Sequence, residues 1–236
     1  MMEKERGMPM DEKENTLCQY ILAKDALKRK VVENTSAAFA LLRDEAKAFF
    51  DCLSDLKEKK AEASELQLSL TDRGKTEFML AFSSDVLLFS QHTNVFEFSR
   101  NHEVMKTPYI KEDPERSYCG LIHIYNFLSD SLLYHRENDL GYLIGRVFVN
   151  KDGHYFIEGK QELGLIYTNF GHAEFNQEAA RTLLRSAMEY TAKFDLLTPP
   201  YDEVKEITVG NIQDELAYKK MRTAKRLGFQ FKADEQ

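Results

Sequence analysis

The sequence predicts an α+β protein in which a helical N-terminal arm leads into a mainly antiparallel β-sheet, with C-terminal helices packed on the sheet. Glycine and proline are absent from residues 13–60, which are largely good helix formers. From about residue 64, apolar and polar residues alternate in short segments separated by turn residues, as in β-strands. Helical periodicity returns at about residue 177. Because helices and strands come in blocks, this order favours α+β over an alternating parallel α/β fold.

These patterns divide the 236-residue chain into three segments. Residues 1–12 show no periodicity and are expected to be a mobile end. Residues 13–62 are expected to form the helical arm, and residues 63–236 an α+β domain. Hydrophobic residues make up 43% of the chain and charged residues 30%, which is ordinary for a folded globular protein and excludes wholesale disorder.

Two helices fit the arm, one reaching about residue 33 and one covering about residues 37–60. Between them, Asn34, Thr35 and Ser36 offer capping side chains, which predict a break or a kink. The first helix carries apolar residues at mostly helical spacing, namely Leu17, Tyr20, Ile21, Leu27 and Val31.

A heptad seam runs along the second helix. Spacings of three and four residues connect Phe39, Leu42, Ala46, Phe49, Leu53 and Leu56. Such a stripe either packs on the protein's own sheet or pairs with a second copy or with a different protein. In the second case the protein is a homo-oligomer or binds a protein partner, with an interface made by Phe39, Leu42, Phe49, Leu53 and Leu56.

Four short strands at close spacing predict an antiparallel meander, at about residues 66–71, 78–82, 86–89 and 95–98. Further strands are expected at about 118–127, 142–149, 154–158 and 163–167, which gives a sheet of roughly six to eight strands. Asn150-Lys151-Asp152-Gly153 is the clearest hairpin turn.

The remaining segments connect or close this sheet. Residues 100–116 are polar, contain two prolines and are expected to form a long surface loop. Residues 132–134 fit either a short strand or a turn of helix. Two C-terminal helices are predicted at about 177–194 and 211–227.

The composition also bounds the location of the protein. Cys18, Cys52 and Cys119 are far apart, so they predict neither a disulfide framework nor a zinc site, and isolated thiols are typical of a reducing compartment. The charged start of the chain has no signal-peptide pattern, and no window approaches the roughly 18 apolar residues of a membrane span. We therefore expect a cytoplasmic protein with no membrane association and no resident metal or cofactor.

Motifs for phosphate loops, dinucleotide binding, the nucleophile elbow and the H-E-x-x-H zinc site are absent from the sequence. Glu158-Gly159-Lys160, with Asp139 upstream, resembles the acidic and E-x-K elements of metal-dependent nucleases of the PD-(D/E)xK type. The resemblance covers about twenty residues, Asp139 is not preceded by proline, and no helical pattern directly follows Lys160. It implies that Asp139 and Glu158 hold Mg²⁺ while Lys160 steadies water or phosphate. Alternatively, Glu158 and Lys160 are solvent-facing charges at a strand end.

A small-ligand pocket lined by aromatic residues is expected on the sheet, around His123, Tyr125 and His135. His123 lies in an apolar strand, where it is either buried and hydrogen-bonded or in contact with a ligand. His135 belongs to the polar segment 134–139, which combines a potential general base with a cation and two carboxylates. A polar turn between two strands explains that segment as well.

Five cations near the C-terminus form the basic group Lys219, Lys220, Arg222, Lys225 and Arg226. They would suit phosphates, an acidic partner or their own helix C-terminus, but the net charge of −7 and the lack of interleaved aromatic residues argue against nucleic-acid binding.

The leading hypothesis is a non-enzymatic interaction or regulatory protein that is oligomeric through its N-terminal helices. The alternative is a Mg²⁺-dependent nuclease or phosphodiesterase that uses Asp139, Glu158 and Lys160.

Overall fold

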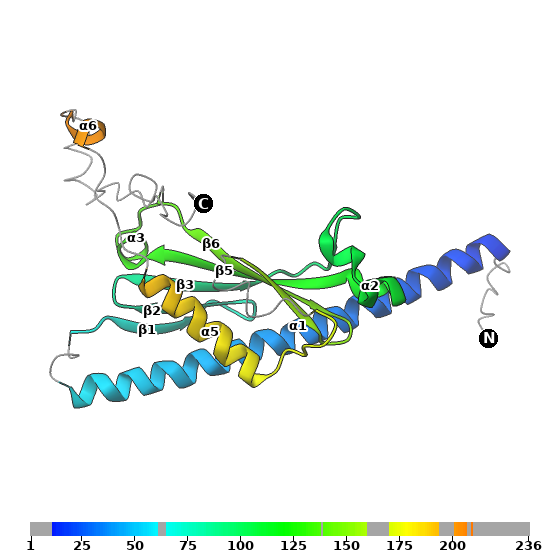
Figure 1. Ribbon diagram of the computed structural model, residues 1–236, viewed down its shortest axis with the longest axis horizontal. Coiled ribbons are helices and arrows are strands. Elements are labelled where there is room, and N and C mark those ends of the chain that lie inside the picture. Colours follow the sequence, from blue (N-terminus) through cyan, green and yellow to red (C-terminus); the bar gives the residue numbers. More distant parts are fainter. Residues whose placement is uncertain are drawn as a thin grey trace, which may run out of the picture.

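The computed structural model describes residues 11–60, 65–137, 139–159, 170–193, 201–206 and 209, and it has an α+β fold. A long N-terminal helix, α1 (Glu12–Lys59), and the helix α5 (Gln177–Ala192) pack on an antiparallel sheet (Figure 1). The predicted fold class is confirmed. The expected strand at 163–167, the expected helix at 211–227 and its basic group lie outside the described residues.

The described residues contribute seven strands, in the order β1-β2-β3-β5-β6-β7 with β4 paired to β5, and every pairing is antiparallel. They are β1 (Leu68–Asp72), β2 (Glu77–Phe82), β3 (Asp85–Gln91), β4 (Phe96–Glu97), β5 (Tyr118–Leu128), β6 (Tyr142–Asn150) and β7 (Tyr155–Gly159). The seven strands predicted between residues 66 and 158 are therefore all present. Gly153 takes a φ of 78° in the β6–β7 hairpin, the conformation for which glycine is suited.

The helix α1 is uninterrupted, so the break predicted at residues 34–36 is wrong. The polar side chains at these positions find partners without ending the helix. Asn34 Nδ2 donates to two backbone oxygens at the β6–β7 turn, at 3.0 and 2.7 Å, and Thr35 Oγ1 donates to the carbonyl one turn back along α1. Ser36 Oγ accepts a hydrogen bond from Gln91 Nε2 at 2.9 Å. Two of these residues thus fasten α1 to the sheet.

The main core lies between the sheet and the two long helices. Alternate strand residues point into it, among them Phe78 of β2, Phe89 of β3 and Ile122 of β5, all fully buried. The rings of Phe78 and Phe89 stack with centroids 4.6 Å apart, and the ring of Phe39 in α1 lies 5.3 Å from that of Phe78. Leu183 brings α5 into the same core. This packing anchors the second half of α1.

The strand β5 passes so close to α1 that residue 120 has no room for a side chain. A Cβ atom on Gly120 would lie 2.0 Å from Thr35 Oγ1 and 2.8 Å from Thr35 Cβ. Glycine therefore permits a close approach of strand to helix at this crossing. Further along β5, the register with β6 shifts, because Ile124 pairs with Gly145 while Tyr125 pairs with Leu143. This irregularity has the form of a β-bulge.

Residues 100–116 form three short helical turns in place of the predicted surface loop. These are η2 (Glu103–Lys106), α2 (Pro108–Glu112) and η3 (Pro114–Ser117). Each begins after a residue whose side chain accepts a hydrogen bond from a backbone N–H of the turn: His102, Thr107 and Asp113. The two prolines stand at the first turn of α2 and η3, a favoured position for proline.

These turns cover part of the second face of the sheet and form a smaller core there. Val104 of η2 and Ile110 of α2 pack with Leu121 of β5, Phe148 of β6 and the buried Phe170. Two further short helices are α3 (Ser129–Leu133), which settles the expectation for residues 132–134 in favour of a helical turn, and α6 (Tyr201–Val204).

Candidate functional site

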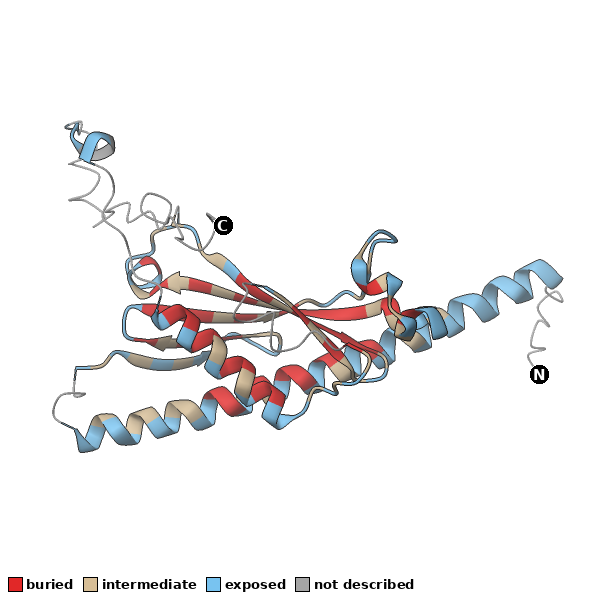
Figure 2. Cartoon of the chain, in the orientation of Figure 1, coloured by how far each residue is buried: buried red, intermediate tan, exposed pale blue. Residues whose placement is uncertain are grey.

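The first part of α1 projects beyond the sheet (Figures 1 and 2). We name residues 12–30 the projecting segment. From residue 12 to residue 23 every residue is exposed, over about 18 Å of helix at 1.5 Å per residue. The Lys24 ammonium nitrogen lies 5.9 Å from the centre of the Tyr118 ring at the start of β5, where the body of the protein begins. Asp11 and Glu14 form a capping box that stabilises the free end of the helix.

Four large apolar side chains of the projecting segment are exposed: Leu17 by 57%, Tyr20 by 60%, Ile21 by 55% and Leu22 by 67%. Three of them, Leu17, Tyr20 and Ile21, lie on one face at spacings of three and four residues. Seven-residue steps lead from Leu17 to the buried Val31 and Ala38, and from Ile21 to the buried Thr35 and Leu42. The face that packs on the sheet therefore continues into the projecting segment, where the sheet no longer covers it and where Lys24 and Lys28 separate its apolar residues from the buried ones.

Charge is unevenly distributed along the projecting segment and its cap. Three carboxylates and one lysine occupy residues 11–14, whereas four cations and one aspartate occupy residues 24–30. Arg29 and Lys30 form ion pairs within α1, and Lys28 forms no side-chain ion pair with any described residue. The free end of α1 is therefore acidic, and the end next to the sheet is basic.

The heptad seam of the second half of α1 has a different environment. Phe39 and Leu42 are buried in the main core, and Phe49 and Leu53 are half-buried. Leu56 is 42% exposed near the end of the helix. The first two residues of the predicted interface thus serve the protein's own core, and in this structure they are not accessible to another chain.

A polar row crosses the second face of the sheet. Strand register places Glu158 of β7 opposite Arg146 of β6, Arg146 opposite His123 of β5, and His123 opposite Ser90 of β3. Arg146 and Glu158 form an ion pair. Burial lowers the pKa of His123 below its ordinary value, and the electrostatic effect of the nearby Arg146 and His92 lowers it further. His123 is therefore neutral near pH 7.

The predicted ligand residues do not all meet. His123 and Tyr125 point to the second face with their rings 5.5 Å apart. His135 lies in the turn after α3, with a φ of 50°. That turn follows the end of β5 at Leu128, whereas His123 lies about 17 Å back along the strand at 3.4 Å per residue.

The carboxylates proposed for a nuclease site have separate partners. Asp139 Oδ2 accepts a hydrogen bond from Ser131 Oγ at 2.7 Å and lies 3.9 Å from Arg136 Nη1, with both charged side chains more than 90% buried. Glu158 pairs with Arg146 on the sheet, and Lys160 lies outside the described residues. Among the residues that the structure describes, no three His, Cys, Asp or Glu side chains are placed to hold a metal ion.

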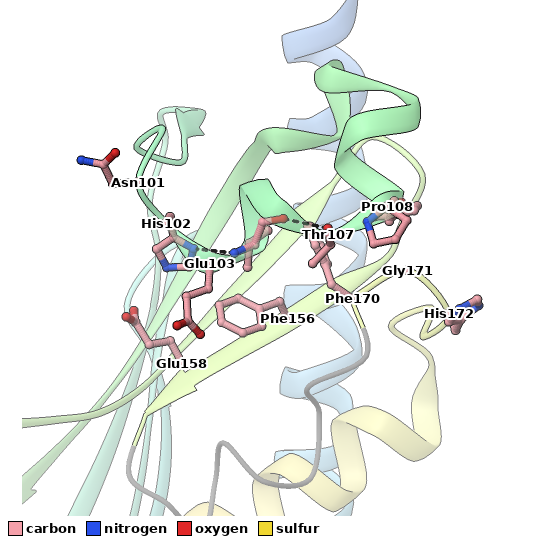
Figure 3. Close-up of a pocket in the computed structure, with 12 residues that line it drawn as sticks. Asn101, His102, Glu103, Thr107, Pro108, Phe156, Glu158, Phe170, Gly171 and His172 are labelled. Carbon is pink, nitrogen blue, oxygen red and sulfur yellow. Dashed lines mark hydrogen bonds between the residues drawn. The ribbon is translucent and has the colours of Figure 1, made fainter.

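A cavity of about 880 Å³ lies between η2, α2, β7 and the segment 170–172 (Figure 3). Val104, Phe156 and Phe170 form apolar parts of its wall, and we name it the aromatic cavity. Glu103 and Glu158 also line it, and Figure 3 shows both carboxylates at one end, beside the Phe156 ring. Of the residues predicted for chemistry, only Glu158 is among those that line this cavity.

The α2 side of the aromatic cavity is held by a polar network. Tyr109 OH donates to Asp152 Oδ2 at 3.1 Å and accepts a hydrogen bond from Asn150 Nδ2 at 2.9 Å. Burial raises the pKa of Tyr109 to about 12, with the Asp152 carboxylate adding to the shift. Arg116 pairs with Asp152 at 2.9 Å and lies over the Tyr109 ring at 4.4 Å. These contacts tie α2 and η3 to the β6–β7 hairpin.

Sequence reasoning missed Glu103, Phe170 and the partner of Glu158. The partner of Glu158 could have been predicted from the hairpin turn at 150–153. Antiparallel pairing across that turn places Phe148 opposite Phe156 and Arg146 opposite Glu158. No local pattern indicated that residues 101–109 and 170–172 would meet above that hairpin.

The described helices include none with the length and apolarity required to cross a bilayer. Comparison with protein-family models, curated proteins and solved structures gives no match for this chain.

Proposed function

We propose that this is an interaction protein that self-associates through the projecting segment of α1. The observation that carries the proposal is the continuation of the core-facing apolar face of α1 past the edge of the sheet. A straight helix anchored in its own core cannot bring that face back onto its own sheet. No described residue covers Leu17, Tyr20 and Ile21, and a second chain with a matching apolar face would do so.

The charge pattern favours a second copy in antiparallel orientation. In that orientation the acidic residues 11–14 of one chain lie beside the basic residues 24–30 of the other, and the same contact is repeated by symmetry. In a parallel pair, acid would face acid and base would face base. Antiparallel pairing therefore gains attraction at both ends of a short apolar contact.

The contact is small, so the association should be reversible. Full burial contributes about 1.5–3 kcal/mol for each large apolar side chain. Two copies would bury six such side chains, which contributes about 9–18 kcal/mol in all, and the loss of translational and rotational freedom on association offsets about 4 kcal/mol or more of that gain. A dissociation constant on the micromolar scale, equivalent to about −8 kcal/mol, is the expected result.

Sedimentation velocity of the full chain, across concentrations that span the micromolar scale, tests the proposal. The wild type should pass from monomer to dimer, and Ile21→Asp should remain monomeric. Leu140→Asp is the matched control, because Leu140 is similarly exposed, at 52%, but lies outside α1. A wild type that stays monomeric throughout, or a dimer that Ile21→Asp leaves intact, would contradict the proposal.

Salt dependence tests the orientation. If the pair is antiparallel, added salt should weaken the wild-type dimer by screening attraction between its ends. Lys28→Glu combined with Lys30→Glu makes both ends acidic, so this variant should dimerise more weakly and recover as salt is added. A wild-type dimer that strengthens with salt would indicate a parallel pair and overturn the antiparallel arrangement.

A further inference from the structure

The aromatic cavity has the size and lining of a small-molecule site, independently of the projecting segment. Its volume of about 880 Å³ lies within the range of ligand pockets, and Val104 and Phe170 in its wall are 7% and 4% exposed. The ring of Phe156 lies 6.2 Å from that of Phe170 in a tilted arrangement. An apolar or aromatic group entering the cavity would meet preformed ring surfaces on more than one side.

One end of the cavity carries negative charge that the described residues neutralise only in part. Glu103 has no hydrogen-bond or ion-pair partner for its carboxylate among the described residues, and its side chain is exposed. Arg146 pairs with Glu158 through Oε2, so Glu103 is the carboxylate at this end for which the described part of the chain supplies no cation. Figure 3 shows the two carboxylates near the Phe156 ring, with His172 at the far end of the cavity.

His102 belongs to the wall of this site and packs against the aromatic rings around it. Its Nδ1 accepts a hydrogen bond from the Val104 backbone N–H at 3.3 Å, which places the proton of the neutral ring on Nε2. The ring stacks on Phe98 with centroids 4.7 Å apart and meets the Phe156 ring edge-on at 6.1 Å. The imidazole thus extends the aromatic surface beside the carboxylates.

We propose that the aromatic cavity binds a small organic ammonium compound, with its charged nitrogen against Glu103 and Glu158 and its apolar part against Phe156 and Phe170. A carboxylate forms its strongest hydrogen bonds with charged donors, and an aromatic face attracts a cation. A neutral isostere would lose the ionic contact. An anion would be repelled by Glu103.

Three probes with the same phenethyl group test this proposal: phenethylammonium, the neutral phenethyl alcohol and the anionic 3-phenylpropionate. Each is titrated into the isotope-labelled full-length protein and followed by NMR chemical shifts. The ammonium should shift resonances of residues around the cavity, Val104 and Gly171 among them, and should bind about tenfold more tightly than the alcohol. The anion should bind more weakly still.

Glu103→Gln should reduce the affinity for phenethylammonium about tenfold and leave the affinity for the alcohol unchanged. Glu137→Gln is the matched control, because Glu137 is also exposed but lies in the turn after α3. Both variants change surface residues, and circular dichroism checks that they fold. Equal binding of the three probes, shifts confined to another part of the protein, or a Glu103→Gln variant with wild-type affinity would overturn the proposal.

Discussion

A methyl group at residue 120 should displace α1 from the sheet. In Gly120→Ala the new Cβ would meet Thr35 Oγ1 at 2.0 Å and Thr35 Cγ2 at 2.9 Å. Favourable separations between such atoms are about 3.5–4.0 Å, so strand and helix would have to move apart by more than about 1 Å. Thr35 is 1% exposed and its hydroxyl is already bonded within α1, so it has no free space into which to rotate. Overpacking of this kind costs about 1–3 kcal/mol.

Urea unfolding monitored by circular dichroism measures this cost at equilibrium. For a chain of this size, 1 kcal/mol corresponds to about 2–4 °C in the midpoint of thermal unfolding, which gives a second readout. A double variant, Gly120→Ala with Thr35→Ala, should recover part of the loss, because it removes the two Thr35 atoms beyond Cβ. If Gly120→Ala is as stable as the wild type, or if the two substitutions are simply additive, the close approach of β5 to α1 is not what requires glycine.

Three further predictions follow from buried groups. A hydrogen bond from Arg181 lowers the pKa of Glu45 below its ordinary value of 4.5. As the pH falls, Glu45 is therefore protonated in the unfolded chain before it is protonated in the folded one. The contribution of Glu45 to stability is complete above about pH 4.5 and is lost as the pH falls through the folded-state pKa. In Glu45→Gln the free energy of unfolding should therefore depend less on pH in that range, as urea unfolding at a series of pH values would measure. Burial raises the pKa of the Cys119 thiol, so iodoacetamide should label the exposed Cys18 and Cys52 of the native protein and reach Cys119 only in denaturant, as mass spectrometry would show. Tyr109→Phe leaves the buried Asn150 amide short of an acceptor and should lower the free energy of unfolding by about 1–3 kcal/mol in urea titrations.

The strands could be predicted because their signal is local. Alternation at Phe78, Leu80 and Phe82 and the turn at Gly153 need no knowledge of distant residues. The break in α1 was mispredicted because Asn34 and Ser36 look like caps in isolation. Their actual partners are on the sheet, more than 50 residues away in sequence. The prolines of residues 100–116 indicate a loop when only the sequence is considered, although Pro108 begins α2.

The sites depend even more on register and tertiary contact. Glu158 attracted attention through a three-residue motif, but its environment is fixed by pairing with Arg146 across the hairpin. His123 and Tyr125 face the second side of the sheet, whereas His135 lies beyond the end of β5, in the turn after α3. Glu103 becomes notable only because η2 packs beside β7.

The uninterrupted course of α1 through residues 34–36 bears directly on the proposed self-association. A kink there would have let the first helix fold back, so that Leu17 and Ile21 could pack on the chain's own sheet. In the uninterrupted helix, Asn34 and Ser36 fix the position of α1 by bonds to the β6–β7 turn and to β3. These bonds, together with the packing of Phe39 and Leu42 in the main core, set the direction of the projecting segment. Replacing Asn34 and Ser36 by alanine should therefore weaken dimerisation without touching the contact itself, whereas an interface formed elsewhere on the molecule would not respond.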